Sequence, residues 1–392
     1  MGMMGEWWKS LSPNVVERGA TLTFGAGKTY ATFDRTGRLL FFTEQGRAVR
    51  RGLDNRMVES IERAEGRSYR DLNDQEKYDF VEAIRVAING YLLANSFVES
   101  EVSAKLRQIV AWTPERLAND EHEFREVYQP ISILPPDHYR SLVIQVAEGC
   151  SYNRCTFCDF YRDRPFHIKS DAQMKGHLQG LLSFFGERMD DRAGIFLGDG
   201  NALVIPTERL LEIIQFIQQM LPSALFQKGM ATFMDTFSLE RKSLTELQTL
   251  RAAGLQSVYV GFETGDDQLR DFLQKQGTTE EAINAMTVLK RAGYQLAVIV
   301  LVGAGGEEFA ESHVVETLAA LQKLPLTSGD MIYLSPFVEP EHTNYQQIIR
   351  NAGYHALSAD DLRTHYELLR QELRRMHPLV KVSMYSILQH LY

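Results

Sequence analysis

All three cysteines of this 392-residue chain lie within nine positions, as Cys150, Cys155 and Cys158. The chain has no other thiol to pair with them, so cysteines clustered in this way favour metal binding over a disulfide framework. A structural zinc ion needs four protein ligands, and no histidine or fourth cysteine follows at zinc-finger spacing. Three thiolates suit a 4Fe-4S cluster, in which they leave one iron open. The spacing therefore predicts such a cluster, with its open iron available to a substrate or cofactor.

Two further stretches place polar residues directly after predicted strands. The first is Gly198-Asp199-Gly200-Asn201, in which two glycines flank a carboxylate. A plain strand-to-helix turn is the alternative explanation for it, but its place after an apolar strand favours ligand binding. The second is Glu263-Thr264, which follows five mostly apolar residues. A buried glutamate is costly unless it is partnered, so this position indicates either a ligand contact or a structural ion pair.

These residues are positioned by an alternation of strands and helices that begins at residue 142. The predicted strands are short, apolar and β-branched, whereas the predicted helices show the wider helical period. Six βα units in succession predict a parallel sheet with right-handed crossovers, curled as a partial (β/α)6 TIM-like barrel. Such a fold carries its chemistry at the carboxyl ends of the strands. The strands are expected at 142–147, 194–198, 228–234, 256–262, 295–302 and 329–335, and the helices at 171–186, 207–220, 239–253, 279–292 and 308–323.

The residues before the barrel indicate an N-terminal α+β module. Residues 20–47 alternate in the manner of strands separated by glycine turns, which predicts a small antiparallel meander. Residues 54–65 and 74–96 have a helical pattern of apolar positions. We expect this module to occupy residues 1–128, the barrel residues 129–340, and a C-terminal helical extension residues 341–392.

Composition limits the classes of partner. A net charge of −9 argues against a nucleic-acid partner, which usually requires a basic face. No apolar run approaches the roughly 20 residues that span a bilayer, and the first eight residues lack the cationic segment and long apolar core of a signal peptide. We therefore expect a cytoplasmic protein with no membrane partner, in the compartment where a reduced, oxygen-sensitive cluster would survive.

The stretch from Gly149 to Cys158, preceded by the apolar run 142–146, resembles the cluster loop of the radical S-adenosylmethionine (radical SAM) superfamily. Its C-x4-C-x2-C spacing is one residue longer than the superfamily's commonest C-x3-C-x2-C. It is similar to the loop of a mostly uncharacterised subgroup with the longer first gap. The resemblance extends over about residues 140–340.

The resemblance implies that SAM binds beside the cluster. Phe157 matches the aromatic residue that usually lies next to bound SAM. The turn at Asp199 resembles the "GGE" motif that holds the amino group of SAM, and the segment at Glu263 resembles one that faces SAM. Gly303 lies in a glycine cluster similar to the family's adenine-contacting segment, for which a tight turn is the competing explanation. The expected SAM contacts are Phe157, Gly198, Asp199, Gly200, Asn201, Glu263, Thr264, Val302, Gly303 and Ser335.

The resemblance also implies a reaction. An electron from the reduced cluster cleaves SAM to methionine and a 5′-deoxyadenosyl radical, which abstracts hydrogen from a small-molecule substrate. The electron would come from a donor such as flavodoxin or ferredoxin. No cysteine is left for an auxiliary cluster or a methyl-carrying thiol. Two alternatives stay open: a non-catalytic iron–sulfur or zinc protein that senses redox state, and a chaperone that binds SAM or haem and delivers it.

Overall fold

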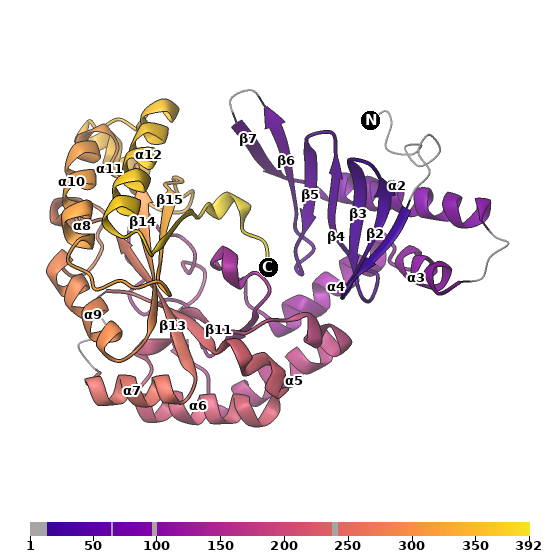
Figure 1. The fold of residues 1–392 in the computed structure, drawn as a ribbon, viewed down its shortest axis with the longest axis horizontal. Coiled ribbons are helices and arrows are strands. Elements are labelled where there is room, and N and C mark those ends of the chain that lie inside the picture. Colours follow the sequence, from indigo (N-terminus) through magenta and orange to yellow (C-terminus); the bar gives the residue numbers. More distant parts are fainter. Residues whose placement is uncertain (1–13, 64–65, 96–99, 237–241) are drawn as a thin grey trace. The chain divides into compact units, whose positions relative to one another are not determined.

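The computed structural model describes residues 14–63, 66–95, 100–236 and 242–392. The chain divides into two compact units, and the course of the chain through its elements can be followed in Figure 1. Unit 1 contains residues 1–130, 180–192 and 388–392, and unit 2 contains residues 131–179 and 193–387. Each unit has a seven-stranded sheet of its own.

Unit 2 is built on a parallel sheet with the strand order β16-β15-β14-β13-β12-β11-β8. Every neighbouring pair in this sheet is parallel, and the partial TIM-like barrel is confirmed. The strands are buried on both faces, as their continuous apolar runs require. The six expected strands are β8 (Leu142–Gln145), β11 (Ile195–Asn201), β12 (Met230–Met234), β13 (Leu255–Glu263), β14 (Gln295–Val302) and β15 (Met331–Pro336).

Helices connect these strands and lie around the outside of the sheet (Figure 1). Capping boxes at Ser243 and Thr278 fix where two of them begin. The expected start of the third helix, at 239–241, lies outside the described residues. No described helix has both the length and the apolar character to cross a membrane. The helices are α5 (Asp171–Phe185), α6 (Thr207–Met220), α7 (Leu244–Ala252), α8 (Asp267–Phe272), α9 (Thr279–Arg291) and α10 (Ala310–Leu321).

The C-terminal residues contribute a seventh strand that the sequence pattern does not predict. The predicted helices are present as α11 (Tyr345–Ala352) and α12 (Ala359–Met376), but β16 (Lys381–Met384) then pairs with β15 in parallel. Four residues are too few to show a strand period, so only pairing with a neighbour defines this strand. As a consequence, the residue after β16, Tyr385, lies at the carboxyl edge of the sheet.

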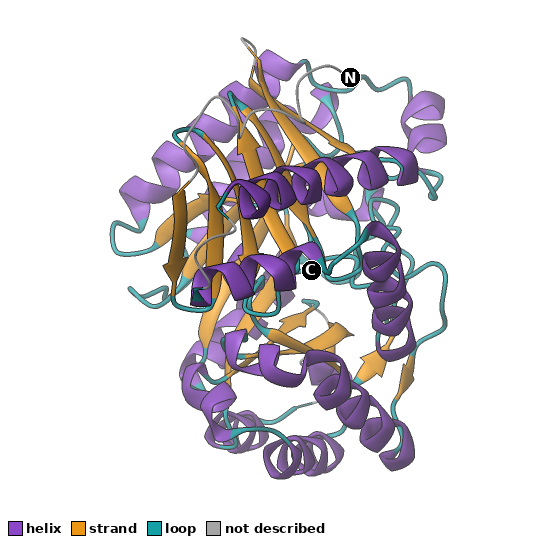
Figure 2. Ribbon diagram, turned by 90° about the vertical axis from the view of Figure 1, so that its right-hand side faces the viewer, coloured by secondary structure: helices purple, strands orange, loops and turns teal. Residues whose placement is uncertain are grey.

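Unit 1 contains an antiparallel meander in strict chain order, β1 to β7. Its inward-facing residues, such as Phe24 and Phe42, form one core with residues of α2 and α3. Figure 2 shows helices lying across this sheet. The elements are β1 (Asn14–Arg18), β2 (Thr21–Ala26), β3 (Thr29–Asp34), β4 (Leu39–Glu44), β5 (Arg47–Arg51), β6 (Met57–Arg63), β7 (Gly66–Asp71), α2 (Asp74–Ala94), α3 (Glu101–Val110) and α4 (Pro114–Val127).

The helix predicted at 54–65 is wrong for residues 54–63, and residues 64 and 65 lie outside the described part of the chain. These residues instead contain β6, which pairs antiparallel with β5 and β7. Asn55 adopts a positive φ of 58° and turns the chain back after β5, so a hairpin forms where the apolar spacing alone resembled a helical stripe. Pairing with a strand on each side therefore makes this segment a strand, although its local pattern of apolar residues resembles a helix.

A buried ion-pair network joins the meander of unit 1 to α4. The Arg38 Nε donates to both carboxylate oxygens of Asp120 at 3.0 Å, and the Arg51 Nη2 lies 3.3 Å from Asp120 Oδ2. Burial opposes ionisation of Asp120, but the two guanidinium groups outweigh it and hold the pKa of the carboxyl below its ordinary value. Arg38 also lies over the Trp112 ring, 4.0 Å from its centroid.

Replacing Asp120 with alanine should lower the free energy of unfolding of unit 1 by about 3–5 kcal/mol, because it leaves two buried guanidinium groups without their carboxylate. Tryptophan fluorescence would measure this, since all three tryptophans fall within residues 1–130. The difference in the free energy of unfolding between the variant and the wild type should shrink below about pH 4. A carboxyl whose pKa is lowered by folding stabilises the fold only at a pH where the carboxyl is ionised in the unfolded chain. Asp74→Ala is the control, since Asp74 is exposed and an exposed ion pair such as the one with Lys77 adds little to stability. Equal losses in the two variants would contradict the prediction.

Candidate metal centre

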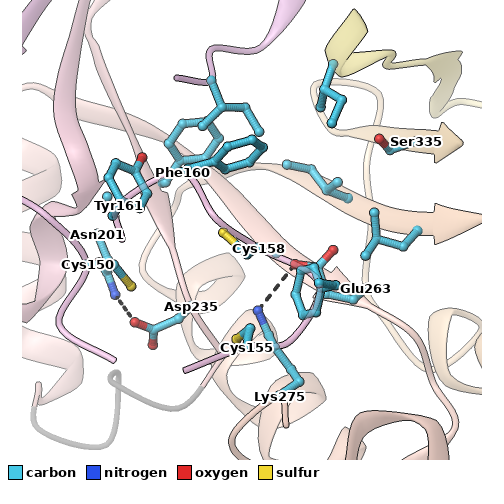
Figure 3. A pocket seen from close by; sticks show the side chains of 18 of the residues that line it. Cys150, Cys155, Cys158, Phe160, Tyr161, Asn201, Asp235, Glu263, Lys275 and Ser335 are labelled. Atoms are coloured by element: carbon cyan, nitrogen blue, oxygen red, sulfur yellow. Dashed lines mark hydrogen bonds and ion pairs between the residues drawn. The ribbon is translucent and has the colours of Figure 1, made fainter. Parts of the chain in front are cut away.

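A pocket at the carboxyl edge of the parallel sheet contains all three cysteines (Figure 3). This is the edge at which the fold class predicts chemistry. All seven strands contribute to the pocket near their carboxyl ends, which lie side by side along one rim. The contributions include Cys150 beyond β8, Asn201 on β11, Asp235 beyond β12, Glu263 on β13, Leu301 on β14, Ser335 on β15 and Tyr385 beyond β16.

The three cysteines are free and partly buried on the loop between two short strands, β9 (Ala147–Glu148) and β10 (His167–Ile168). Burial raises the pKa of Cys155 to about 11 and that of Cys158 to about 12. A bound metal cation lowers the pKa of such thiols, because it binds the thiolate form. No three His, Cys, Asp or Glu side chains of the described residues converge as ligands of a single ion. The three cysteine ligands of a 4Fe-4S cluster bind three different irons, so their sulfur atoms do not need to converge on one point. Three thiols in one pocket therefore fit that ligand set.

The shape of the cysteine loop is held by Arg162 and by a glycine. Arg162 donates from Nη2 to the carbonyl oxygen of Cys155 at 2.7 Å and from Nε to that of Cys158 at 3.3 Å. Gly149, just before Cys150, has a φ of 75°, and a β-carbon there would lie 2.9 Å from the carbonyl oxygen of Pro165. Only glycine satisfies both conditions without strain. The loop therefore presents its cysteines on a fixed backbone.

Asp199 fastens the cysteine loop to β11. Its carboxylate accepts hydrogen bonds from Arg164 Nε at 3.0 Å, from Gln145 Nε2 at 2.6 Å and from the Gly149 backbone N–H at 3.3 Å. The side chains of Arg164 and Asp199 are 7% and 3% exposed, so this ion pair is almost removed from water. Burial raises the pKa of Asp199, and Arg164 opposes that rise. The carboxylate predicted to hold the amino group of SAM is thus already engaged within the protein.

The backbone next to Asp199 is open to the pocket. Gly200 and Asn201 both line it, whereas Gly198 and Asp199 do not. A β-carbon on Gly200 would lie 3.3 Å from the carbonyl oxygen of Gly149, so a side chain there would press on the cysteine loop. Asn201 points its amide at Asp235, with Nδ2 2.8 Å from Oδ2 (Figure 3). Only the last two residues of the turn 198–201, which resembles the GGE motif, therefore line the pocket.

Glu263 lines the pocket and is paired with a lysine. Its Oε1 lies 3.3 Å from Lys275 Nζ, and both side chains are at most 10% exposed (Figure 3). Glu263 has a φ of 66°, which is unusual for a residue with a side chain. The turn that carries Lys275 is bound to the cysteine loop, because Leu273 accepts a hydrogen bond from the Thr156 N–H at 2.9 Å. The ion pair foreseen for the glutamate is present, and its contact with SAM stays a prediction.

The remaining predicted SAM contacts divide into two groups. Phe157 and Ser335 line the pocket. Thr264 faces the protein, where its hydroxyl lies 2.8 Å from His313 Nδ1. Val302 is fully buried, and a β-carbon on Gly303 would lie 2.5 Å from the Leu362 side chain. Thr264, Val302 and Gly303 are outside the lining of the pocket.

Several residues that line the pocket were not predicted from the sequence, and Lys275 and Tyr385 are two of them. Lys275 had only a weak signal, its position one short helix after the Glu263 segment. Tyr385 had none, because it follows the unexpected strand β16. Both depend on tertiary structure that a local pattern does not reveal.

Comparisons with known proteins found one matching family model and several similar solved structures. Residues 144–321 match the model of the Radical SAM superfamily. No curated protein matches the chain. The similar solved structures include coproporphyrinogen III oxidase (HemN) from Escherichia coli, with 14% identity and a TM-score of 0.45 over 60% of this chain and 52% of that one. They also include a mutant of spore photoproduct lyase, with 13% identity and a TM-score of 0.45 over 66% and 79% of the two chains. The chain spans about half the length of HemN.

Asp199→Ala should make the cysteine loop more mobile, and its effect should not be limited to SAM binding. The change leaves the buried Arg164 charge and the Gly149 N–H without their acceptor, at a cost of about 3–5 kcal/mol. We expect faster hydrogen exchange across residues 149–166 and a lower iron content after reconstitution. Asp163→Ala is the matched control, because it removes the more exposed partner of the same arginine. If loop exchange and iron content stay normal while SAM binding is lost, Asp199 contacts SAM directly and the positioning role is wrong.

Proposed function

We propose that this protein, in which residues 144–321 form a radical SAM domain, is an enzyme that binds a 4Fe-4S cluster through Cys150, Cys155 and Cys158. The observation that carries the proposal is that every cysteine of the chain lines one pocket at the carboxyl edge of a partial barrel. When bound, the reduced cluster supplies the electron that cleaves SAM to methionine and a 5′-deoxyadenosyl radical.

The chain offers SAM a polar rim beside the cysteines. The pocket is lined there by Gly200, Asn201 and Glu263, and on its far side by Ser335 (Figure 3). A cationic amino group is held best by carbonyl and carboxylate oxygens, which this rim supplies. Phe157 provides an aromatic face next to Cys158. These residues support binding of SAM in contact with the three cysteines.

The remaining lining is mostly apolar and limits the access of water. Phe233, Met234, Ile299 and Leu301 border the pocket from the ends of β12 and β14. A dry wall protects a reactive intermediate from side reactions and strengthens the electrostatic interactions inside the site. This environment supports radical transfer to a small-molecule substrate held in the same pocket. We further propose flavodoxin or ferredoxin as the electron donor and the cytoplasm as the compartment.

Replacing Cys155 with alanine should abolish both cluster assembly and SAM cleavage, because three ligands hold the cluster as a unit. The protein would be reconstituted anaerobically with iron and sulfide. Iron content, the absorption band at roughly 400 nm typical of such clusters, and 5′-deoxyadenosine formed from SAM with a chemical reductant would then be measured. The wild-type protein should give all three signals.

Ser151→Ala is the matched control, since Ser151 is an exposed residue of the same loop. It should keep both the cluster and 5′-deoxyadenosine formation. A wild-type protein that assembles the cluster but forms no 5′-deoxyadenosine would instead fit a redox sensor or a chaperone for SAM or haem. Full retention of iron in Cys155→Ala would show that the proposed ligand set is wrong.

A further inference from the structure

Lys275 is the one lysine or arginine among the described residues that line the pocket. Its side chain is 7% exposed, so the ammonium group is almost removed from water. Its Nζ lies 3.3 Å from Glu263 Oε1 and 5.9 Å from the centre of the Phe157 ring (Figure 3). Burial lowers the pKa of Lys275, but Glu263 and Cys155 outweigh burial and raise that pKa above its ordinary value. The pocket wall therefore carries a positive charge at neutral pH.

The turn of residues 273–275, which ends at this lysine, is bound to the cysteine loop at two points. The Thr156 N–H donates to the first carbonyl oxygen of the turn at 2.9 Å, and the Tyr152 hydroxyl donates to the second at 2.9 Å. Thr156 directly follows Cys155, and Tyr152 precedes it by three positions. Gln274 has a φ of 50°, a conformation that persists only where the surroundings enforce it. The turn therefore holds its lysine at a fixed place relative to Cys155.

Lys275 is the charged side chain that acts most strongly on Cys155. Burial raises the pKa of the Cys155 thiol to about 11, and the Lys275 ammonium group is the strongest of the charges that act on it, in the opposite sense. The Glu263 carboxylate assists burial, but more weakly than the ammonium group opposes it. The ion pair therefore acts on Cys155 as a net positive charge.

Stability alone does not account for a lysine at this position. A buried ion pair can often be replaced by apolar residues of similar volume with no loss of stability, and much of the pocket lining is apolar, with Phe233, Met234 and Leu301 as examples. Costly buried charges in a cleft are found preferentially at functional sites. A role in the chemistry of the neighbouring cysteine explains why the charge is present.

We propose that Lys275 stabilises the reduced state of the cluster through its effect on Cys155, and so raises the potential at which the cluster accepts an electron. Reduction adds one electron from an external donor, and the negative charge that this adds is attracted by a fixed cation. The net charge around an iron–sulfur cluster is one of the factors that set its potential. The inference rests on the proposed function, because it takes Cys155 as a ligand of the cluster.

The test measures the midpoint potential of the reconstituted full chain by a reductive titration without SAM, followed through the absorption of the cluster. Lys275→Gln should lower the potential, because the reduced state loses its cation. We expect about a tenfold smaller equilibrium constant for the one-electron reduction, which corresponds to about 59 mV. Lys275→Arg should keep the potential near that of the wild type, because arginine keeps the charge.

A double variant removes the complication that Lys275→Gln leaves the buried Glu263 carboxylate without its partner. Lys275→Gln/Glu263→Gln removes both charges, and its potential should also lie below that of the wild type, because the ammonium group acts on Cys155 more strongly than the carboxylate does. An ion pair with only a structural role would behave differently. Its removal would lower the iron content and leave the potential of the clusters that do assemble unchanged.

Lys290→Gln is the matched control, because it removes the cation of another buried ion pair. Lys290 Nζ lies 2.6 Å from Asp330 Oδ2, and the Asp330 side chain is fully buried. Asp330 directly precedes β15, whereas the pocket residue Ser335 lies near the opposite end of that strand. The control variant should unfold at a lower temperature than the wild type and keep its potential.

Three results would overturn the inference: a wild-type potential in the double variant, a double variant that no longer holds a cluster, or an equal fall of the potential in Lys275→Arg or Lys290→Gln. Weaker SAM binding by Lys275→Gln with an unchanged potential would show that Lys275 contacts SAM and does not act on the cluster.

5′-Deoxyadenosine formation by the wild type, measured in parallel, separates the two proposals. SAM cleavage with a potential that does not depend on Lys275 leaves the proposed function standing and this inference wrong. A cluster whose potential depends on Lys275, in a protein that does not cleave SAM, supports this inference and contradicts the proposed enzyme. A wild-type protein that assembles no cluster would overturn both.

Discussion

The carboxyl ends of parallel strands must meet at one edge of a sheet, and the site of this protein depends on that constraint. Strand order places β8 at one side of the sheet and β16 at the other, yet both contribute to the same pocket through Cys150 and Tyr385. Curling of the sheet into a partial barrel accounts for this, because it turns the row of strand ends into a rim. The loops along the rim then supply side chains to a shared space, and the cysteine loop supplies the most.

Buried ion pairs hold the loops of this rim together. Arg164 of the cysteine loop pairs with Asp199 at the end of β11, and Lys275 pairs with Glu263 at the end of β13. Such pairs add little net stability, but removing one partner is expensive because the other charge stays buried. Their geometry is therefore strongly determined. The pairing with Arg164 gives Asp199 a positioning role, and it leaves Gly200 and Asn201 as the open part of that turn.

The sequence predicts the metal ligands well because all three lie on one loop, and it predicts six strands because each is a continuous apolar run that is buried on both faces. The wrong or missing predictions concern strands that form only by pairing with segments distant in the sequence. β16 is too short to show a period, and β6 shows apolar spacing compatible with a helix until β5 and β7 pair with it. Lys275 and Tyr385 were missed for the same reason. Thr264 and Gly303 lie on the expected segments, but local sequence does not encode the direction in which each one faces.

Backbone strain in the described part of unit 2 is concentrated at the same rim. Its non-glycine residues with positive φ are Asn153, Glu263 and Gln274, at 49°, 66° and 50°. Asn153 is in the cysteine loop, Glu263 lines the pocket, and Gln274 precedes Lys275. Each such conformation costs on the order of 1–3 kcal/mol and persists only where the surroundings enforce it. The Tyr152 hydroxyl provides one such restraint, since it donates to the Gln274 carbonyl oxygen at 2.9 Å. The strained backbone is a cost to stability, and it occurs along the rim that carries the pocket.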